Sequence, residues 1–178
     1  SSFTLTATDQ SGNKAVALFS DAGVSKNYQH WADAGTGDWN GDILNDSKSN
    51  YFEGEVIPHV YVIEGTNSKP LVPGQTYSFT IVYNFYQQNT NAGGFAFITT
   101  FNRSRTPGLL AGATGITPVI DNTVTTGNQG LFHTVNADIL SATAPVQSGS
   151  GTFDQTVTVT FKYTGTDPQG MVEIYYGL

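Results

Sequence analysis

Apolar and polar residues alternate with a period of two along most of the chain, and the alternating stretches are rich in β-branched and aromatic residues. The longest runs over 77–86, where every odd-numbered residue from Tyr77 to Phe85 is aromatic or isoleucine. We therefore expect the odd-numbered side chains of this strand to face a core. Ten extended residues span about 33 Å, so the sheet that contains them should be tall.

No stretch keeps the 3.6-residue period of an amphipathic helix for three turns. The pattern predicts eight strands: Phe3–Ala7, Ala15–Phe19, Glu55–Ile63, Tyr77–Tyr86, Phe95–Phe101, Phe132–Leu140, Thr156–Tyr163 and Val172–Tyr176. Val72-Pro73-Gly74-Gln75 fits a type II turn directly ahead of the strand at Tyr77–Tyr86. Two long irregular loops are expected at 20–50 and 103–130. The prediction is an all-β protein, a single antiparallel β-sandwich of jelly-roll or immunoglobulin-like type.

The first predicted strand lies almost at the beginning of the sequence and has one apolar face, formed by Phe3, Leu5 and Ala7, opposite a face of threonines. Two interpretations fit such a strand. It is either an ordinary edge strand of its own domain, or residues 1–10 are a donor strand that is exchanged between subunits. The alternation alone does not separate the two.

Length and composition agree with one domain over residues 1–178, large enough to bury a core without a disulfide or metal. Charged residues make up only 12% of the chain, against about 25% in ordinary soluble domains. Uncharged polar residues must therefore cover much of the surface. Such a surface is typical of proteins that pack into arrays or lie outside the cell, and carbohydrate-binding modules share it.

Charge and residue usage argue against several classes of protein. A net charge of −7 with seven scattered basic residues is unfavourable for binding nucleic acid. No apolar run has the length of a membrane helix, so no membrane insertion is expected. The absence of cysteine rules out disulfides, zinc thiolate sites and thiol nucleophiles. The opening Ser1-Ser2-Phe3, without a charged leader, is typical of a mature secreted chain, so an extracellular location is expected.

Six of the fourteen acidic residues fall within 33–55, where Lys48 is the one basic residue. Asp38-Trp39-Asn40-Gly41-Asp42 places oxygen ligands at alternate positions, the spacing with which a calcium loop surrounds its cation. Ile43 and Ser49 stand where an EF-hand needs glycine and glutamate, so the segment is not an EF-hand. A solvated turn without metal is the alternative. The predicted calcium ligands are Asp38, Asn40, Asp42, Asp46, Glu53 and Glu55.

Catalytic patterns are weak. Glu53, Glu55, Glu64 and Glu173 are formal candidates for glycoside hydrolysis, but nothing in the sequence selects a pair at the separation that the reaction needs. The three histidines lack a nucleophile elbow and have none of the common metal-binding spacings. We therefore expect a protein that is not an enzyme. Its 22 aromatic residues keep glycans as an alternative partner, since exposed rings can stack on sugars.

The chain resembles the cannula subunits, secreted proteins of hyperthermophilic archaea that assemble into hollow extracellular tubes. The segments that carry the resemblance are Gly12-Asn-Lys-Ala-Val-Ala-Leu-Phe19, Gly37-Asp-Trp-Asn-Gly41, Tyr51-Phe-Glu-Gly-Glu-Val-Ile-Pro-His-Val-Tyr-Val-Ile-Glu64, Asn91-Ala-Gly-Gly-Phe95 and Tyr175-Tyr-Gly-Leu178. They extend nearly from end to end, and the central block is the most specific.

The resemblance implies a β-sandwich subunit that assembles with calcium, with strand exchange between neighbours and ions near the subunit contacts. The partner would be further copies of the same chain, in a tubule or filament. The low Lys and Glu content departs from the usual composition of hyperthermophile proteins. A calcium-stabilised carbohydrate-binding module and a surface adhesin domain are the alternative functions.

Overall fold

The computed structural model describes residues 2–8, 14–20, 25–42, 44–45, 47–87, 92–110, 115–118, 131–148 and 152–178, and all regular structure within these ranges is β-strand. The prediction of an all-β, antiparallel fold is confirmed. Within the same ranges, no helix is long and apolar enough to cross a membrane.

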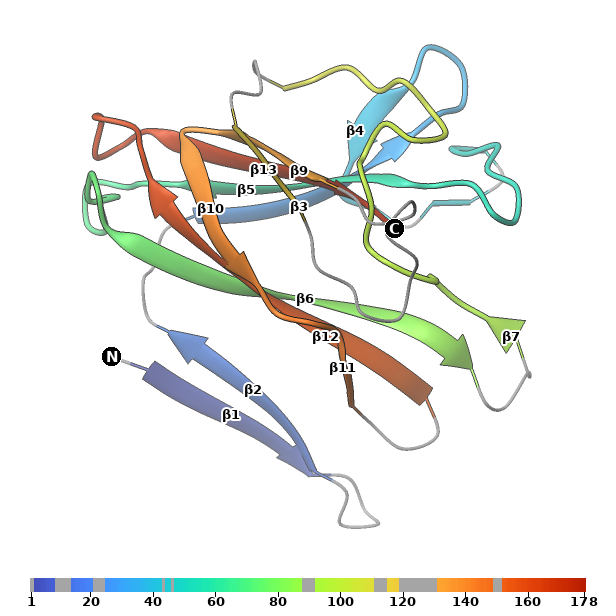
Figure 1. Ribbon diagram of the computed structural model, residues 1–178, viewed down its shortest axis with the longest axis horizontal. Helices are drawn as coiled ribbons and strands as arrows, with labels where there is room; N and C mark the ends of the chain where they lie inside the picture. The colour runs from blue at the N-terminus through green and yellow to red at the C-terminus, as the bar shows by residue number, and fades with distance from the viewer. Residues whose placement is uncertain are drawn as a thin grey trace.

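The strands form one hairpin and two larger sheets (Figure 1). The hairpin consists of β1 (Ser2–Thr8) and β2 (Lys14–Ser20). The six-stranded sheet has the order β4-β3-β5-β13-β9-β8. Its strands are β3 (Ser25–Ala32), β4 (Asp38–Asn40), β5 (Pro58–Glu64), β8 (Gly115–Pro118), β9 (Leu131–Val135) and β13 (Met171–Gly177).

The five-stranded sheet has the order β10-β12-β6-β7, with β11 also paired to β12. Its strands are β6 (Thr76–Gln87), β7 (Ala92–Gly93), β10 (Ala137–Ala142), β11 (Val146–Ser148) and β12 (Thr152–Tyr163). β6 and β12 are the longest strands and pair along nearly their whole length. The tall sheet expected from the long alternating run is therefore present.

Alternation in β6 decides which side chains are buried. Ile81 and Tyr83 are 5% and 3% exposed, and Tyr77 and Phe79 pack against the same core, whereas Val82 on the other face is 59% exposed. The predicted core face of this strand is thus confirmed for the residues whose burial is described. The predicted type II turn is also confirmed, because Gly74 has a φ of 79° and the Gln75 amide donates to the Val72 carbonyl at 3.0 Å.

Side chains of both large sheets contribute to one hydrophobic core, an arrangement consistent with the predicted β-sandwich. Val157, Val159 and Phe161 of β12 meet Val172 and Ile174 of β13 in this cluster, and all five are fully buried. A second, smaller cluster forms on the outer face of the six-stranded sheet, around Trp39, Val60, Val62, Phe101 and Tyr175. This sheet is therefore covered on both faces.

A single residue carries the chain from one sheet to the other. Asn136 lies between β9 and β10 and has a φ of 55°, a left-handed conformation that Asn tolerates better than most residues. Its side-chain amide donates to the Met171 carbonyl, and its own carbonyl accepts from the Thr164 amide. The two sheets therefore adjoin at this corner. The sequence prediction of one strand over Phe132–Leu140 is wrong, because the chain turns at Asn136.

Three further predictions are wrong, the first two of them in part. The expected loop at 20–50 contains β3 and β4, and the expected loop at 103–130 contains β8. Phe95–Phe101 forms no strand; its one ladder contact is a bridge between Thr99 and Gly177. Whether these segments form strands depends on hydrogen bonds to neighbouring strands rather than on local composition.

Candidate functional site

The side of the molecule opposite the Asn136 corner is open. β4 pairs with β3 only from His30 to Ala32, and β7 pairs with β6 only at Tyr86 and Gln87. In the described part of the chain, no strand pairs with the outer edge of β3 over 25–29 or of β6 over 76–82. The two sheets thus present two strand edges whose backbone groups can accept a further strand.

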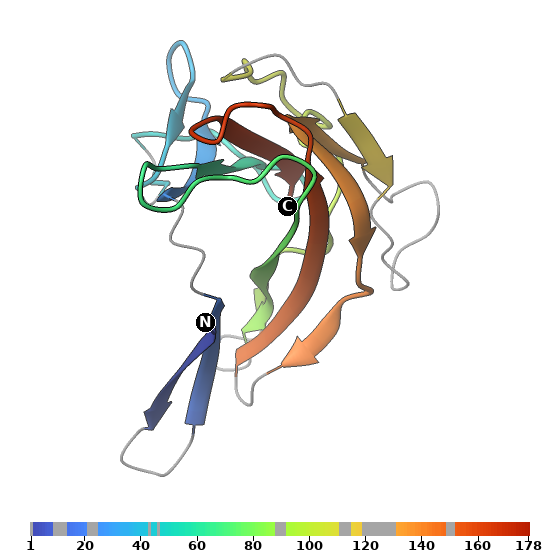
Figure 2. The same cartoon turned by 90° about the vertical axis from the view of Figure 1, so that its left-hand side faces the viewer.

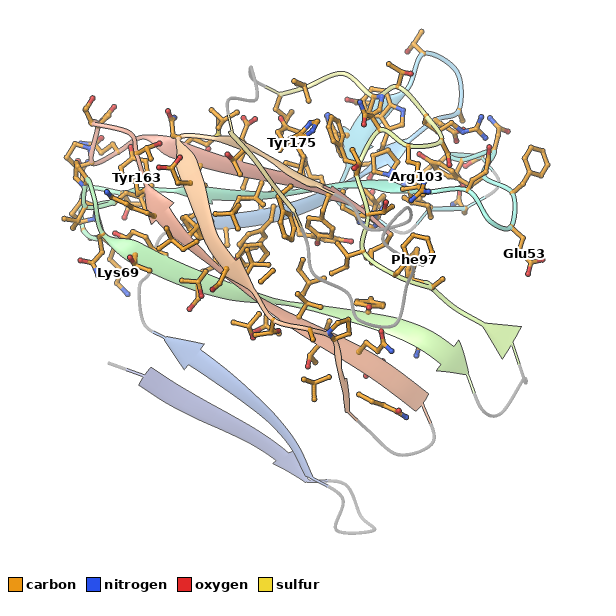
Figure 3. All side chains as sticks on the ribbon, viewed as in Figure 1. Glu53, Lys69, Phe97, Arg103, Tyr163 and Tyr175 are labelled. Carbon is orange, nitrogen blue, oxygen red and sulfur yellow. The ribbon has the colours of Figure 1, made fainter. Side chains whose placement is uncertain are left out.

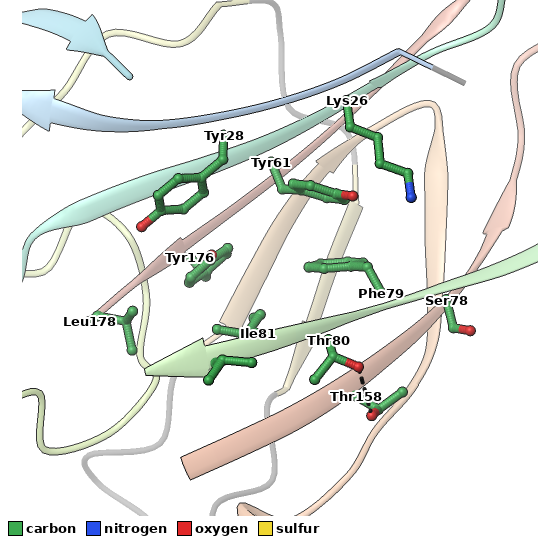
Figure 4. Close-up of a pocket in the computed structure, with 11 residues that line it drawn as sticks. Lys26, Tyr28, Tyr61, Ser78, Phe79, Thr80, Ile81, Thr158, Tyr176 and Leu178 are labelled. Carbon is green, nitrogen blue, oxygen red and sulfur yellow. Dashed lines mark hydrogen bonds between the residues drawn. The ribbon is translucent and has the colours of Figure 1, made fainter. Parts of the chain in front are cut away.

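A groove of about 700 Å³ lies between these two edges (Figure 4). β3 contributes Lys26 and Tyr28, and residues 78–82 of β6 line the opposite wall. Tyr61 of β5 and Phe79 of β6 stack with their ring centres 4.5 Å apart, so an aromatic pair joins the two sheets within the groove. Tyr176 and Leu178 close its inner end.

The groove is largely apolar and aromatic. Tyr28 is 43% exposed, and Lys26 is the one charged side chain among the described residues that line the groove. Burial raises the pKa of Tyr28 to about 12 and raises that of Tyr61 as well, so both phenols stay neutral at ordinary pH. Such a surface suits an uncharged, apolar segment or a sugar ring better than an anion.

The β1–β2 hairpin stands apart from the two larger sheets (Figure 2). Within the described residues its two strands pair with each other, from Ser2↔Ser20 to Thr8↔Lys14, and with no other strand. This register puts the predicted assembly residues Phe3, Leu5 and Ala7 opposite Phe19, Ala17 and Ala15 of β2. An isolated two-stranded ribbon is marginally stable in water.

The predicted calcium ligands do not all converge. Asp38 and Asn40 lie on β4 and Asp42 follows directly, but their oxygens are used within the chain. Asp38 accepts from the Trp39 amide at 2.8 Å, Asn40 accepts from the Asp42 amide at 2.7 Å, and Asp42 forms an ion pair with Lys48 at 3.1 Å. Asp46 lies outside the described residues.

Glu53 and Glu55 belong to a different surface. Glu53 lies at the exposed tip of the 52–55 turn and points away from the body (Figure 3). Glu55 instead pairs with Arg105, whose Nε lies 3.3 Å from Asp33 and whose charged group lies over the Tyr51 ring. Among the described residues no group of three or more His, Asp or Glu side chains gathers as a metal site. Of the predicted ligands that the structure describes, Asp38, Asn40 and Asp42 therefore lie at the β4 loop, Glu55 lies in the Arg105 cluster, and Glu53 lies apart from both.

A row of aromatic and imidazole rings borders the inner end of the groove. His30 and His59 face each other directly across β3 and β5, and Tyr176 pairs with His59 on the next strand. The Tyr28 hydroxyl hydrogen bonds with Nδ1 of His59, and His59 stacks on Tyr176 with ring centres 5.5 Å apart. Sequence reasoning missed this row because its members come from three strands; the alternation of His59 with Tyr61 was the one available signal.

Burial lowers the pKa of His59 to about 3, with the nearby His30 adding to the effect. The pKa of His30 is lowered as well, mainly by burial, although a hydrogen bond with the Asp42 backbone opposes the shift. Both imidazoles are therefore neutral at ordinary pH. Nothing in this row resembles a nucleophile, and its side chains can bind or pack.

Comparison of the chain with protein-family models, with characterised proteins and with solved structures finds no match.

Proposed function

We propose that this protein is a structural subunit that assembles with other copies of itself outside the cell, by adding a strand of one copy to the open side of the next. The observation that carries the proposal is the pair of strand edges, over 25–29 of β3 and 76–82 of β6, that no strand of the described residues covers on either side of an apolar groove. Long exposed strand edges are normally blocked in monomeric proteins, and these two lie beside the partly exposed aromatic rings of the groove.

The N-terminal hairpin supplies a matching segment. β1 reads Ser-Phe-Thr-Leu-Thr-Ala-Thr, which has no charge and alternates apolar residues with threonine. One face of such a strand can fill the groove while its backbone completes the ladder of a neighbouring subunit. The low charge density of the whole chain also leaves little repulsion between copies.

Calcium belongs to the proposal through the acidic loop. Asp38, Asn40 and Asp42 offer hard oxygen ligands, and a neighbouring subunit would have to supply the rest, because within the described residues these oxygens already accept hydrogen bonds or pair with Lys48. Calcium bound between subunits would stabilise the assembly by mass action and would have little effect on the monomer.

Strand donation is tested with a chain that lacks residues 1–10 and a synthetic peptide of that sequence. The truncated chain should stay folded, fail to polymerise and bind the peptide in fluorescence anisotropy. Leu5→Glu in the peptide should abolish binding, whereas Thr6→Glu on the opposite face should be tolerated. A truncated chain that still forms polymers seen by electron microscopy would rule out donation by this strand.

The calcium component is tested separately by light scattering during addition and chelation of Ca²⁺. Asp38→Asn combined with Asp42→Asn should raise the Ca²⁺ concentration that assembly needs, while Asp138→Asn, at an exposed position of β10, should leave it unchanged. Assembly that is indifferent to Ca²⁺ in the unaltered protein would remove calcium from the proposal and leave strand addition standing.

A carbohydrate-binding module is the second candidate, and the aromatic lining of the groove favours it. Tyr28, Tyr61 and Phe79 present rings in an open depression, as sugar-binding surfaces do. A glycan array separates the two functions. Binding to one class of glycan by a chain that stays monomeric with Ca²⁺ would favour the module over the assembling subunit.

A further inference from the structure

His30 and His59 form a cross-strand pair that the sequence conceals. They are directly opposed on β3 and β5, their ring centres are 6.2 Å apart, and the rings are nearly perpendicular. Each has a buried Nε2 with no hydrogen-bond partner in the described structure. His59 is only 3% exposed, so leaving an imidazole nitrogen unpaired there costs free energy.

A neighbour holds the second ring nitrogen of His59. Nδ1 of His59 hydrogen bonds with the Tyr28 hydroxyl, which can either donate or accept, and the His30 ring has a hydrogen bond with the Asp42 backbone. Metal-binding histidines show this arrangement, since an outer partner on one nitrogen fixes the ring and its tautomer while the other nitrogen binds the ion. The feature that distinguishes this pair from ordinary core histidines is the other nitrogen of each ring, since both Nε2 atoms are buried without a partner in the described structure.

We propose that His30 and His59 bind one divalent transition-metal ion, of the Zn²⁺ and Cu²⁺ class, through their two Nε2 atoms. Imidazole nitrogen suits these ions, whereas calcium requires oxygen ligands, so this site is chemically distinct from the acidic loop. With metal–nitrogen bonds of about 2.0–2.1 Å, two bound imidazoles have ring centres about 5–6 Å apart, close to the 6.2 Å between the rings of His30 and His59.

The protein supplies two ligands of this site. No third His, Asp or Glu joins the pair within the described residues, so water or a small anion completes the coordination. His30 is only partly buried, which gives solvent access from the side of β3. On binding, Nδ1–H of His59 donates to the Tyr28 oxygen, and the two sheet strands become cross-linked beside the groove.

The test uses tag-free, chelator-treated full-length protein without Ca²⁺. Addition of one equivalent of Cu²⁺ should give an electron paramagnetic resonance spectrum with hyperfine structure from two nitrogens, and calorimetry with Zn²⁺ should give one site per chain. His30→Gln should reduce the spectrum to one nitrogen at most and lower Zn²⁺ affinity by more than about tenfold, because loss of outer partners alone typically costs about 10–100-fold.

Two further variants keep the proposal falsifiable. Tyr28→Phe keeps the ring and removes the orienting hydroxyl, so it should weaken Zn²⁺ binding while leaving the two-nitrogen spectrum. His133→Gln, the remaining histidine, should change neither measurement. If the His59→Gln variant does not fold, the His30→Gln variant, altered on the partly exposed strand β3, still tests whether both histidines bind the ion. Absence of a two-nitrogen spectrum, or a spectrum that survives His30→Gln, overturns the site.

Discussion

β13 and the β1–β2 hairpin are both antiparallel and both rich in residues that favour strands, yet they are held in opposite ways. β13 lies between β5 and β9, and every residue from Val172 to Gly177 is buried. The hairpin pairs only with itself in the described structure. Because an isolated two-stranded ribbon is only marginally stable in water, we expect β13, which a third strand and a second layer cover, to be far more stable than the hairpin.

The largest expected effect comes from a substitution that leaves a cavity beneath β13. Ile174→Ala removes a fully buried side chain from the main core and should lower the free energy of unfolding by about 2–5 kcal/mol. Leu140→Ala, at a 54% exposed position, should change it by less than about 0.5 kcal/mol. Urea denaturation of the Ca²⁺-free monomer measures both. Equal effects would mean that β13 is not the centre of the fold.

The layer over the outer face of β13 provides a second test. Arg105 ties the 101–110 segment to Asp33 and Glu55, and this segment also donates the Leu110 amide to the Tyr175 hydroxyl. Arg105→Met should cost about 2–3 kcal/mol, because two carboxylates lose their partner in a partly buried place. Lys48→Met, which breaks the more exposed pair with Asp42, should cost less than about 1 kcal/mol in the same denaturation experiment.

Acid should weaken the side of the molecule that contains β13. His59 stays neutral in the fold down to a pKa of about 3, whereas in the unfolded chain its pKa is near 6.5. The unfolded state therefore binds the additional proton, so stability is full above about pH 6.5 and falls as the pH is lowered toward 3. The slope should approach about 1.4 kcal/mol per pH unit.

This slope is best measured between about pH 5 and 6.5, where most carboxylates are still ionised. Burial lowers the pKa of His30 and His133 too, so the unaltered chain should show a steeper slope than one histidine gives. His59→Gln should flatten the profile more than His133→Gln. A profile that His59→Gln leaves unchanged would show that His59 titrates normally in the fold.

The smallest effect is expected in the hairpin. Leu5→Ala should change the unfolding free energy of the free monomer by less than about 0.5 kcal/mol, because β2 is the one strand of the described residues that pairs with β1. Hydrogen exchange should agree, with fast exchange of hairpin amides and slow exchange of β13 amides. If β1 is donated to a neighbouring subunit, Leu5→Ala should strongly destabilise the polymer. A large effect in the monomer would show that the hairpin is covered by its own chain.

The sequence predicted what short-range alternation determines. The core face of β6 and the turn at Gly74 could be identified, because period-two patterning and the need for a positive φ are local properties. β3 was missed since Ser25–Ala32 contains no β-branched residue, and its strand conformation depends on pairing with β5. Phe95–Phe101 has the composition of a strand but lacks a continuous neighbour.

The candidate sites divide in the same way. An acidic cluster is visible in the sequence, but its separation into the β4 loop and the Arg105 cluster depends on contacts between Glu55 and a residue fifty positions away. The groove could not be predicted at all, because it results from the short lengths of β4 and β7. The pairing of His30 with His59 likewise depends on the register between two strands.

The corner at Asn136 places a narrow limit on how this sequence can diverge. A left-handed residue here excludes β-branched side chains, and glycine would keep the backbone but lose the bond to the Met171 carbonyl. Any descendant of this chain that retains the fold should therefore keep asparagine at position 136, or change it only together with the strand that it holds.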